Sequence, residues 1–186
     1  HFQARRVDKS NAGGVRHTPQ DNNELHRFIP RRATAKRICL SRPDRLMSGE
    51  VRVDLAGRVA RVTLSHNGKL NAMSRNMWRA LRDQFAALQG RDDVRCVVLQ
   101  GEDGNFCAGG DISEYPDFRY DETALREFHE LDVWGGLQAV LDCDVPVIAL
   151  IEGACMGAGV ELASCCDIRI AGATAQFGAP IARLGF

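Results

Sequence analysis

The chain has 186 residues, of which 45% are hydrophobic, and this composition excludes a disordered protein over most of its length. Its formal net charge is zero, but residues 1–46 carry a net charge of +7 and residues 47–186 a net charge of −7. The acidic larger part argues against nucleic acid as a partner there, and no apolar run approaches the ~20 residues of a membrane span.

Residues 1–46 lack apolar periodicity and contain two arginine pairs, Arg5-Arg6 and Arg31-Arg32. We interpret them as a disordered basic leader, with a natural start at Met47, because basic runs are usually solvated. Two alternatives stay open, an organelle transit peptide and an arm that binds nucleic acid. The expected location is the cytoplasm, or the mitochondrion if the leader is a transit peptide.

The next segments predict a hairpin followed by a helix. Residues 51–55 and 59–64 are rich in β-formers and are separated by a break at Ala56-Gly57-Arg58. Ser74 can cap the helix that follows, and Gly90 ends it. One face of this helix is expected to carry Met77, Leu81, Phe85 and Leu88.

Strands and helices alternate over the rest of the chain. Short apolar runs predict buried parallel strands at 94–101 and 145–151, with further strands at 167–172 and 175–178. Helices are expected at 122–142, with Leu125, Phe128, Leu131, Leu137 and Leu141 at helical spacings, and at 157–166. This alternation predicts an α/β fold with a largely parallel sheet.

The seven cysteines include no C-x-x-C pair, and most lie in apolar surroundings. This pattern indicates buried thiols in a reducing compartment, without a disulfide framework or a zinc site.

Two glycine-rich loops, "EDGNFCAGGD" (102–111) and "GACMGAGVELASCCD" (153–167), directly follow predicted strands. The second loop has the wrong glycine order for a dinucleotide site, no lysine for a P-loop and no serine for a nucleophile elbow. A nucleophile at Cys155 would need a histidine partner that is not evident. Close packing of a helix on a strand remains the purely structural alternative.

The ordered motifs "KLNAM" (69–73), "FCAGGDISEY" (106–115), "IEGACMGAGVELASCCDIRIAG" (151–172) and "AQFGAPIARLG" (175–185) resemble the enoyl-CoA hydratase/isomerase (crotonase) family. The resemblance covers residues 49–186. It implies the crotonase-like (ClpP/crotonase) spiral of ββα units, incomplete in its C-terminal helical part. It also implies an enzyme of fatty acid metabolism.

The resemblance implies that each glycine loop supplies one backbone N–H to an oxyanion hole for an acyl-CoA thioester. By position the donors are Gly110 and Ala158, the latter where the family often has glycine. Such donors stabilise the enolate that forms when a proton leaves the α-carbon, and one donor can be worth ~3 kcal/mol. Glu161 matches a catalytic glutamate, expected to act as a buried general acid or base.

The second family glutamate would stand at Ile181, which puts the two-carboxylate hydratase mechanism in doubt and favours isomerisation. Coenzyme A enters as part of the substrate, and no metal or other cofactor is implied. The expected assembly is a homotrimer or a dimer of trimers. The residues implied in substrate and CoA binding are Lys69, Leu70, Ala72, Ala108, Gly110, Asp111 and Ile112.

Other interpretations of these residues remain. Glu161 could be a solvated helical residue or a partner of Arg169. We interpret Asp111, Glu114 and Tyr115 as a salt-bridged turn with a packing aromatic, in preference to pocket residues. Because of Ile181 and the missing C-terminal part, the chain could also be a non-catalytic acyl-CoA binder or a nonfunctional fragment.

Overall fold

The computed structural model describes residues 49–180, so the basic leader (1–46), Met47 and Ile181 lie outside the described residues. The main sheet has the strand order β1-β2-β3-β4-β6, with one antiparallel pair, β1 and β2, and parallel pairing elsewhere. Its strands are β1 (Glu50–Ala56), β2 (Val59–Ser65), β3 (Cys96–Gly101), β4 (Val147–Ile151) and β6 (Ile168–Ala171). The predicted α/β fold with a largely parallel sheet is confirmed.

The predicted hairpin is also confirmed. Ala56 pairs with Val59, so only Gly57 and Arg58 form the turn, and Gly57 has a positive φ of 62°. Tight hairpin turns require such φ values, which glycine adopts without steric cost. Alternate residues of β2 are fully buried, namely Ala60, Val62 and Leu64.

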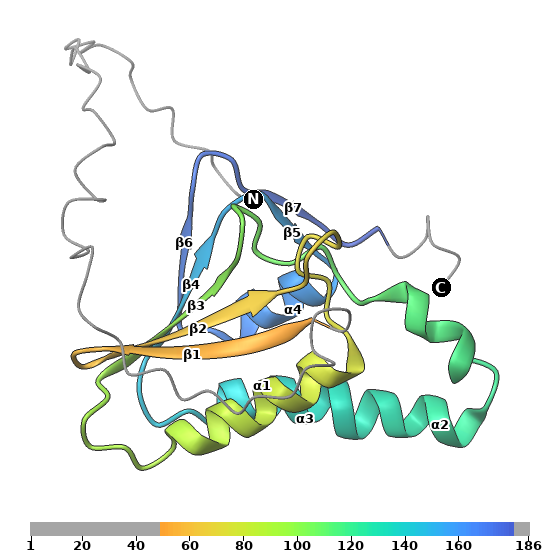
Figure 1. Cartoon of the computed structure of the whole chain (residues 1–186), viewed down its shortest axis with the longest axis horizontal. Coiled ribbons are helices and arrows are strands. Elements are labelled where there is room, and N and C mark those ends of the chain that lie inside the picture. Colours follow the sequence, from red (N-terminus) through yellow and green to blue (C-terminus); the bar gives the residue numbers. More distant parts are fainter. Residues whose placement is uncertain (1–48, 181–186) are drawn as a thin grey trace, which may run out of the picture. The chain divides into compact units, whose positions relative to one another are not determined.

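Helix α1 (Arg75–Leu88) begins where the sequence predicts, because the Ser74 side chain accepts a hydrogen bond of 3.2 Å from the Met77 N–H. Its buried face carries Met77, Trp78, Leu81, Phe85 and Leu88. The predicted apolar face is therefore confirmed, with Trp78 added to it. In Figure 1, α1 and α3 (Trp134–Leu141) lie side by side below the sheet.

The prediction of a single helix at 122–142 is wrong in one respect, because a π-helical turn interrupts it. The segment consists of α2 (Glu122–Glu127), the π-helical turn η4 (Phe128–Val133) and α3. A π-helical turn accommodates an extra residue, which shifts the phase of the helix surface. Leu131, expected on the apolar face, is therefore exposed, while Asp132 is buried. Leu141, also expected there, is exposed at the end of α3.

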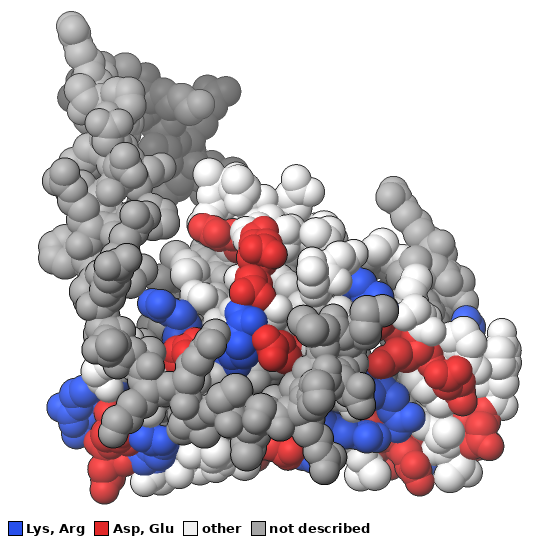
Figure 2. Space-filling view, viewed as in Figure 1, with Lys and Arg blue, Asp and Glu red and all other residues white. Residues whose placement is uncertain are grey.

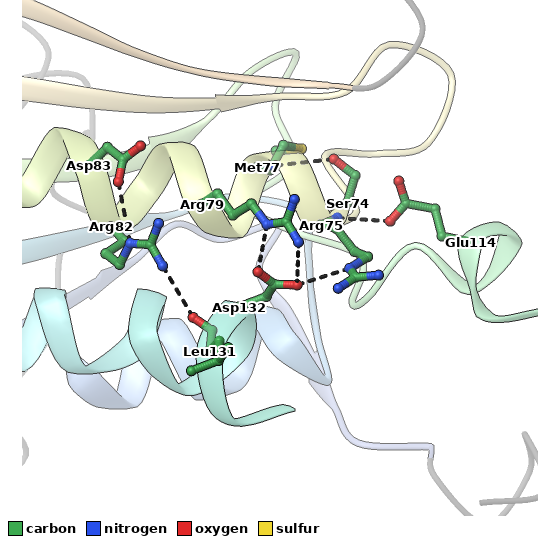
Figure 3. A network of polar contacts seen from close by, with 9 residues as sticks. All are labelled: Ser74, Arg75, Met77, Arg79, Arg82, Asp83, Glu114, Leu131 and Asp132. Carbon is green, nitrogen blue, oxygen red and sulfur yellow. Dashed lines mark hydrogen bonds and ion pairs between the residues drawn. The ribbon is translucent and has the colours of Figure 1, made fainter. Parts of the chain in front are cut away.

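Asp132 is held at this turn by two arginines of α1. Its carboxylate accepts hydrogen bonds of 2.9 Å from Arg75 Nε and 2.6 Å from Arg79 Nε (Figure 3). The Arg75 guanidinium also lies 5.1 Å from the centre of the Phe118 ring, at cation–π distance. These contacts fix the π-helical turn to the N-terminal half of α1.

A small second sheet pairs β5 (Ala154–Met156) with β7 (Gln176–Gly178) in parallel, and α4 (Ala158–Cys165) follows β5. The strand at 175–178 and the helix at 157–166 are confirmed. The sequence did not predict β5, because three residues inside a glycine motif carry no measurable periodicity.

The described surface carries both signs of charge. Figure 2 shows acidic and basic side chains interspersed over one face of residues 49–180. Within this range the structure contains no helix with the length and apolar character needed to cross a membrane.

Candidate active site

The two glycine loops meet at the junction of the two sheets. Cys107 forms an isolated parallel bridge with Cys155. Its N–H donates to the Ala154 carbonyl at 2.8 Å, and its carbonyl accepts from the Met156 N–H at 2.9 Å. The segments 102–111 and 153–167 therefore form one backbone-bonded unit, although about 40 residues of chain separate them.

Gly110 follows this bridge and pairs with Met73. In that pair Met73 makes both bonds, donating to the Gly109 carbonyl at 2.8 Å and accepting from the Asp111 N–H at 2.9 Å. The N–H of Gly110 takes no part in the pairing, so it points away from Met73. No residue among 49–180 accepts a hydrogen bond from it.

The second loop brings a helix terminus to the same place. A β-carbon on Gly157 would lie 3.8 Å from the Gly109 Cα, so the two loops are in contact. Gly157 has a φ of 47°, and α4 begins at the next residue, Ala158. The first N–H groups of a helix have no intrahelical acceptor, and within the described part of the chain the N–H of Ala158 has none.

Glu161 lies in the first turn of α4, three residues after Ala158. Its side chain is exposed, so the burial expected for this carboxylate is wrong for the described residues. The alternative pairing with Arg169 is also wrong, since Arg169 instead donates to the carbonyls of Ala163 and Cys166 at the end of the helix. Glu161 forms no ion pair with any residue between 49 and 180.

The Glu161 carboxylate is nevertheless close enough to Tyr115 for its charge to affect the pKa of that residue. The pKa of the Tyr115 phenol is raised, first by burial and then by the negative charge of Glu161. Tyr115 follows the first loop and Glu161 lies in the second, so this charge effect links the two loops electrostatically.

Lys69 and Asp111 form an ion pair that joins "KLNAM" to the first loop. Lys69 Nζ lies 2.6 Å from Asp111 Oδ2 and donates to Ser113 Oγ at 2.8 Å. Burial acts to raise the pKa of the Asp111 carboxyl, but the hydrogen bonds from Lys69 and Ser113 hold it below its ordinary value. The interpretation of Asp111 as part of a salt-bridged turn agrees with this contact.

The remaining residues implied in CoA binding differ in exposure. Leu70 and Ile112 are exposed, at 53% and 54%, whereas Ala72 is buried. Ala108 is half-buried, and its N–H donates to the Leu70 carbonyl at 3.0 Å. The structure thus places Lys69, Leu70, Ala108, Gly110 and Asp111 along one line of contact between "KLNAM" and the first loop.

Asn71, between two of the predicted site residues, was not singled out by the sequence analysis. It is buried, and its side chain binds the His66 N–H and the carbonyls of Glu102 and Asn105. It thereby fixes the loops that follow β2 and β3. Asn71 has a positive φ of 60°, a conformation in which asparagine is enriched. The sequence does not show the φ value of a residue, so this property could not identify Asn71 in advance.

The cysteines near the site are not activated thiols. Burial raises the pKa of Cys107 to about 12 and that of Cys155 to about 11. Since the thiolate is the reactive form, neither residue is suited to nucleophilic or redox chemistry at neutral pH. The region 49–180 contains no cluster of three or more His, Cys, Asp or Glu side chains that could hold a metal ion.

Comparison with known proteins gives a consistent result. Residues 54–186 match the family model described as enoyl-CoA hydratase/isomerase. A probable enoyl-CoA hydratase, EchA14 of Mycobacterium tuberculosis, is 37% identical over 127 residues, which are 68% of this chain and 48% of that protein. A probable enoyl-CoA hydratase of Rhizobium meliloti is 35% identical over 133 residues, covering 72% of this chain and 50% of the relative.

Solved structures agree. An enoyl-CoA hydratase/carnithine racemase from Magnetospirillum magneticum superposes with a TM-score of 0.71 at 32% identity, covering 77% of this chain and 55% of that one. A putative enoyl-CoA hydratase/isomerase family protein from Hyphomonas neptunium gives 0.70 at 36% identity, covering 76% and 54%. The fold is the crotonase fold, and the chain spans about half the length of the curated relatives it matches. The chain belongs to the enoyl-CoA hydratase/isomerase family.

Proposed function

We propose that this protein acts on an acyl-CoA thioester, holding the thioester oxygen with the N–H groups of Gly110 and Ala158 and using Glu161 to move a proton. The observation that carries the proposal is the pair of N–H groups. They come from two loops in contact with each other, and neither has an acceptor among residues 49–180.

Such a pair is suited to a developing negative charge. When a proton leaves the carbon α to a thioester, its bonding electrons delocalise onto the thioester oxygen. Donors that are already in place stabilise this oxygen without reorganisation, and the loss of one costs roughly 10²- to 10³-fold in kcat. The N-terminus of α4 adds a favourable helix dipole beside Ala158.

Glu161 is the proton carrier of the proposal. As a carboxylate it would take a proton from the α-carbon of a 3-enoyl-CoA and return it to the γ-carbon, which yields the 2-enoyl-CoA with no net change in protons. This cycle needs one carboxylate only. It fits a sequence in which Ile181 occupies the position of the second family glutamate.

Binding of the CoA moiety is proposed along the contact between "KLNAM" and the first loop. Lys69 uses two of its three ammonium donors on Asp111 and Ser113, which leaves one for a phosphate. Backbone groups around Leu70, Ala72, Ala108 and Ile112 would contact the adenine and pantetheine parts. We also propose the homotrimer or dimer of trimers that the family resemblance implies.

The test uses the 186-residue chain with 2-enoyl-CoA and 3-enoyl-CoA as substrates. We expect interconversion of the two thioesters, and a loss of at least about 100-fold in kcat for Glu161→Gln, which keeps the shape but cannot accept the proton. Glu127→Gln, an exposed helical glutamate with no described contact, is the matched control and should retain full activity. Activity that survives Glu161→Gln would remove Glu161 from the mechanism.

A second function, non-catalytic binding of acyl-CoA, is favoured by Ile181 alone. Calorimetric titration with a 2-enoyl-CoA separates the two. Binding without turnover by the wild-type chain supports the binder, and turnover excludes it.

A further inference from the structure

Tyr115 lies on a short 3₁₀ helix, Ile112–Asp117, which is anchored by its N-cap residue Asp111 and by Glu114. Asp111 caps it by accepting a hydrogen bond of 3.1 Å from the Ser113 N–H. The carboxylate of Glu114 accepts one of 2.8 Å from the Arg75 N–H at the start of α1 (Figure 3). The backbone that carries Tyr115 is therefore fixed relative to the first glycine loop and to α1.

The ring of Tyr115 is held in turn by two aromatic neighbours. Its centroid lies 5.4 Å from that of Phe118 and 5.8 Å from that of Phe128, in tilted and edge-on arrangements. Phe118 and Phe128 are both buried. Both contacts are made by the ring, so a phenylalanine at this position would retain them.

The hydroxyl group is placed at the oxyanion-hole loop. A β-carbon on Gly110 would lie only 3.0 Å from the Tyr115 hydroxyl oxygen, so this oxygen rests directly against Gly110. Gly110 is one of the two site residues whose N–H has no acceptor within the described part of the chain. The hydroxyl therefore lies beside a residue that carries one of the two N–H groups proposed to hold the thioester oxygen.

The electrostatic surroundings keep this hydroxyl protonated. Burial, followed by the charges of Glu161 and Asp111, raises the pKa of the phenol, and Arg119 only partly opposes this. A neutral phenol is a hydrogen-bond donor, whereas a phenolate would repel an enolate.

We propose that Tyr115 is a catalytic residue whose hydroxyl donates a third hydrogen bond to the thioester oxygen, beside the N–H groups of Gly110 and Ala158. This inference rests on the proposed acyl-CoA activity and adds a side-chain donor to its two backbone donors. The hydrogen bond strengthens as negative charge builds on the oxygen, so its effect falls on kcat more than on KM.

Tyr115→Phe tests the proposal, because it removes the oxygen and keeps the ring contacts with Phe118 and Phe128. We expect a decrease in kcat of about 10- to 100-fold, with KM changed by less than about threefold. Tyr120→Phe is the matched control, since Tyr120 is 87% exposed, and it should behave as the wild type.

A second readout does not depend on turnover. Dimethylaminocinnamoyl-CoA, a thioester whose absorption moves to the red when its carbonyl is polarised, is titrated into each variant. The red shift should be smaller in Tyr115→Phe than in the wild type and in Tyr120→Phe.

The outcomes separate this inference from the proposed function. If the wild type turns over enoyl-CoA and Tyr115→Phe equals it in kcat, the role of Tyr115 is refuted while the activity stands. If kcat falls but the red shift is unchanged, the hydroxyl does not contact the thioester oxygen and the proposal is also refuted. If the wild type neither binds the dye thioester nor turns over substrate, the proposed function fails, and this inference fails with it.

Discussion

Gly159 is the residue that allows α4 to approach the first glycine loop. A β-carbon there would lie 2.5 Å from the carbonyl oxygen of Cys107 and 3.1 Å from its Cβ, both closer than atoms can approach without displacement. We expect Gly159→Ala to lower the free energy of unfolding by about 1–3 kcal/mol, because a backbone carbonyl cannot rotate away as a side chain can. Urea denaturation followed by circular dichroism measures this change.

The control for Gly159 is another helical glycine. A β-carbon on Gly135, in α3, would meet Arg82 Cδ at 3.5 Å, an ordinary contact. Because alanine is the better helix former, Gly135→Ala should raise the free energy of unfolding by about 0.5–1 kcal/mol. Equal effects of the two substitutions would show that close packing of α4 on Cys107 is not what requires Gly159.

At the residue scale the sequence predicted the glycine loops, but it could not say which contacts require each glycine. Gly159 faces a carbonyl 52 positions earlier in the chain, and no local pattern encodes that approach. Tyr115 was interpreted as a packing residue, and its ring does pack on Phe118 and Phe128. The position of its hydroxyl against Gly110 depends on the 3₁₀ helix Ile112–Asp117, which the sequence did not predict.

At the element scale, the π-helical turn between α2 and α3 depends on the ion pairs of Asp132. The Asp132 side chain is only 4% exposed, whereas the side chains of Arg75 and Arg79 are 27% and 48% exposed and can be rehydrated. Asp132→Asn is expected to lower the free energy of unfolding at pH 7 by about 1.5–3 kcal/mol, the range for hydrogen bonds to charged groups. Asp83→Asn, at an exposed pair with Arg82, should change it by less than about 0.5 kcal/mol.

The pH dependence of this effect has a definite sign. Burial acts to raise the pKa of Asp132, but the hydrogen bonds from Arg79 and Arg75 lower it overall below its ordinary value. The stabilisation is therefore fully present above the unfolded pKa of about 3.9 and is lost as pH falls through the lower folded pKa. Unfolding measured between pH 7 and pH 2 should show the difference between the wild type and Asp132→Asn decreasing as the pH falls below about 3.9. A difference that stays constant over this range would contradict the role of the ionised carboxylate.

The same turn shows why the sequence predicted most elements but not this one. Apolar periodicity located α1 and the strands of the main sheet, because their buried residues recur at the spacings of regular structure. Leu131 also fits a helical spacing, yet it is exposed, since the π-helical turn changes the phase and brings Asp132 inward. The partners that make this favourable, Arg75 and Arg79, lie more than 50 residues away.

At the scale of the whole molecule, two asparagines connect the loops at the carboxyl ends of the strands. The Asn71 side chain accepts from the His66 N–H at 3.1 Å and donates to the carbonyls of Glu102 and Asn105 at 2.8 Å each. Asn105 Oδ1 in turn accepts from the Ala154 N–H at 3.0 Å, at the start of β5. The chain of contacts joins the main sheet to the small sheet and so fixes both proposed oxyanion-hole loops.

Asn71→Ala should therefore weaken the molecule as a unit. It removes three hydrogen bonds at a buried site and places alanine at a φ of 60°, which asparagine adopts more easily. We expect the free energy of unfolding to fall by about 2–4 kcal/mol, with one cooperative transition and an unchanged m-value. Asn67→Ala, at an exposed position of the same turn, should change it by less than about 0.5 kcal/mol.

If Asn71→Ala instead gave two separate transitions, the two sheets would be unfolding independently, and the asparagine contacts would be what couples them. A loss no larger than that of Asn67→Ala would show that water replaces these hydrogen bonds and that the loops are positioned by packing alone.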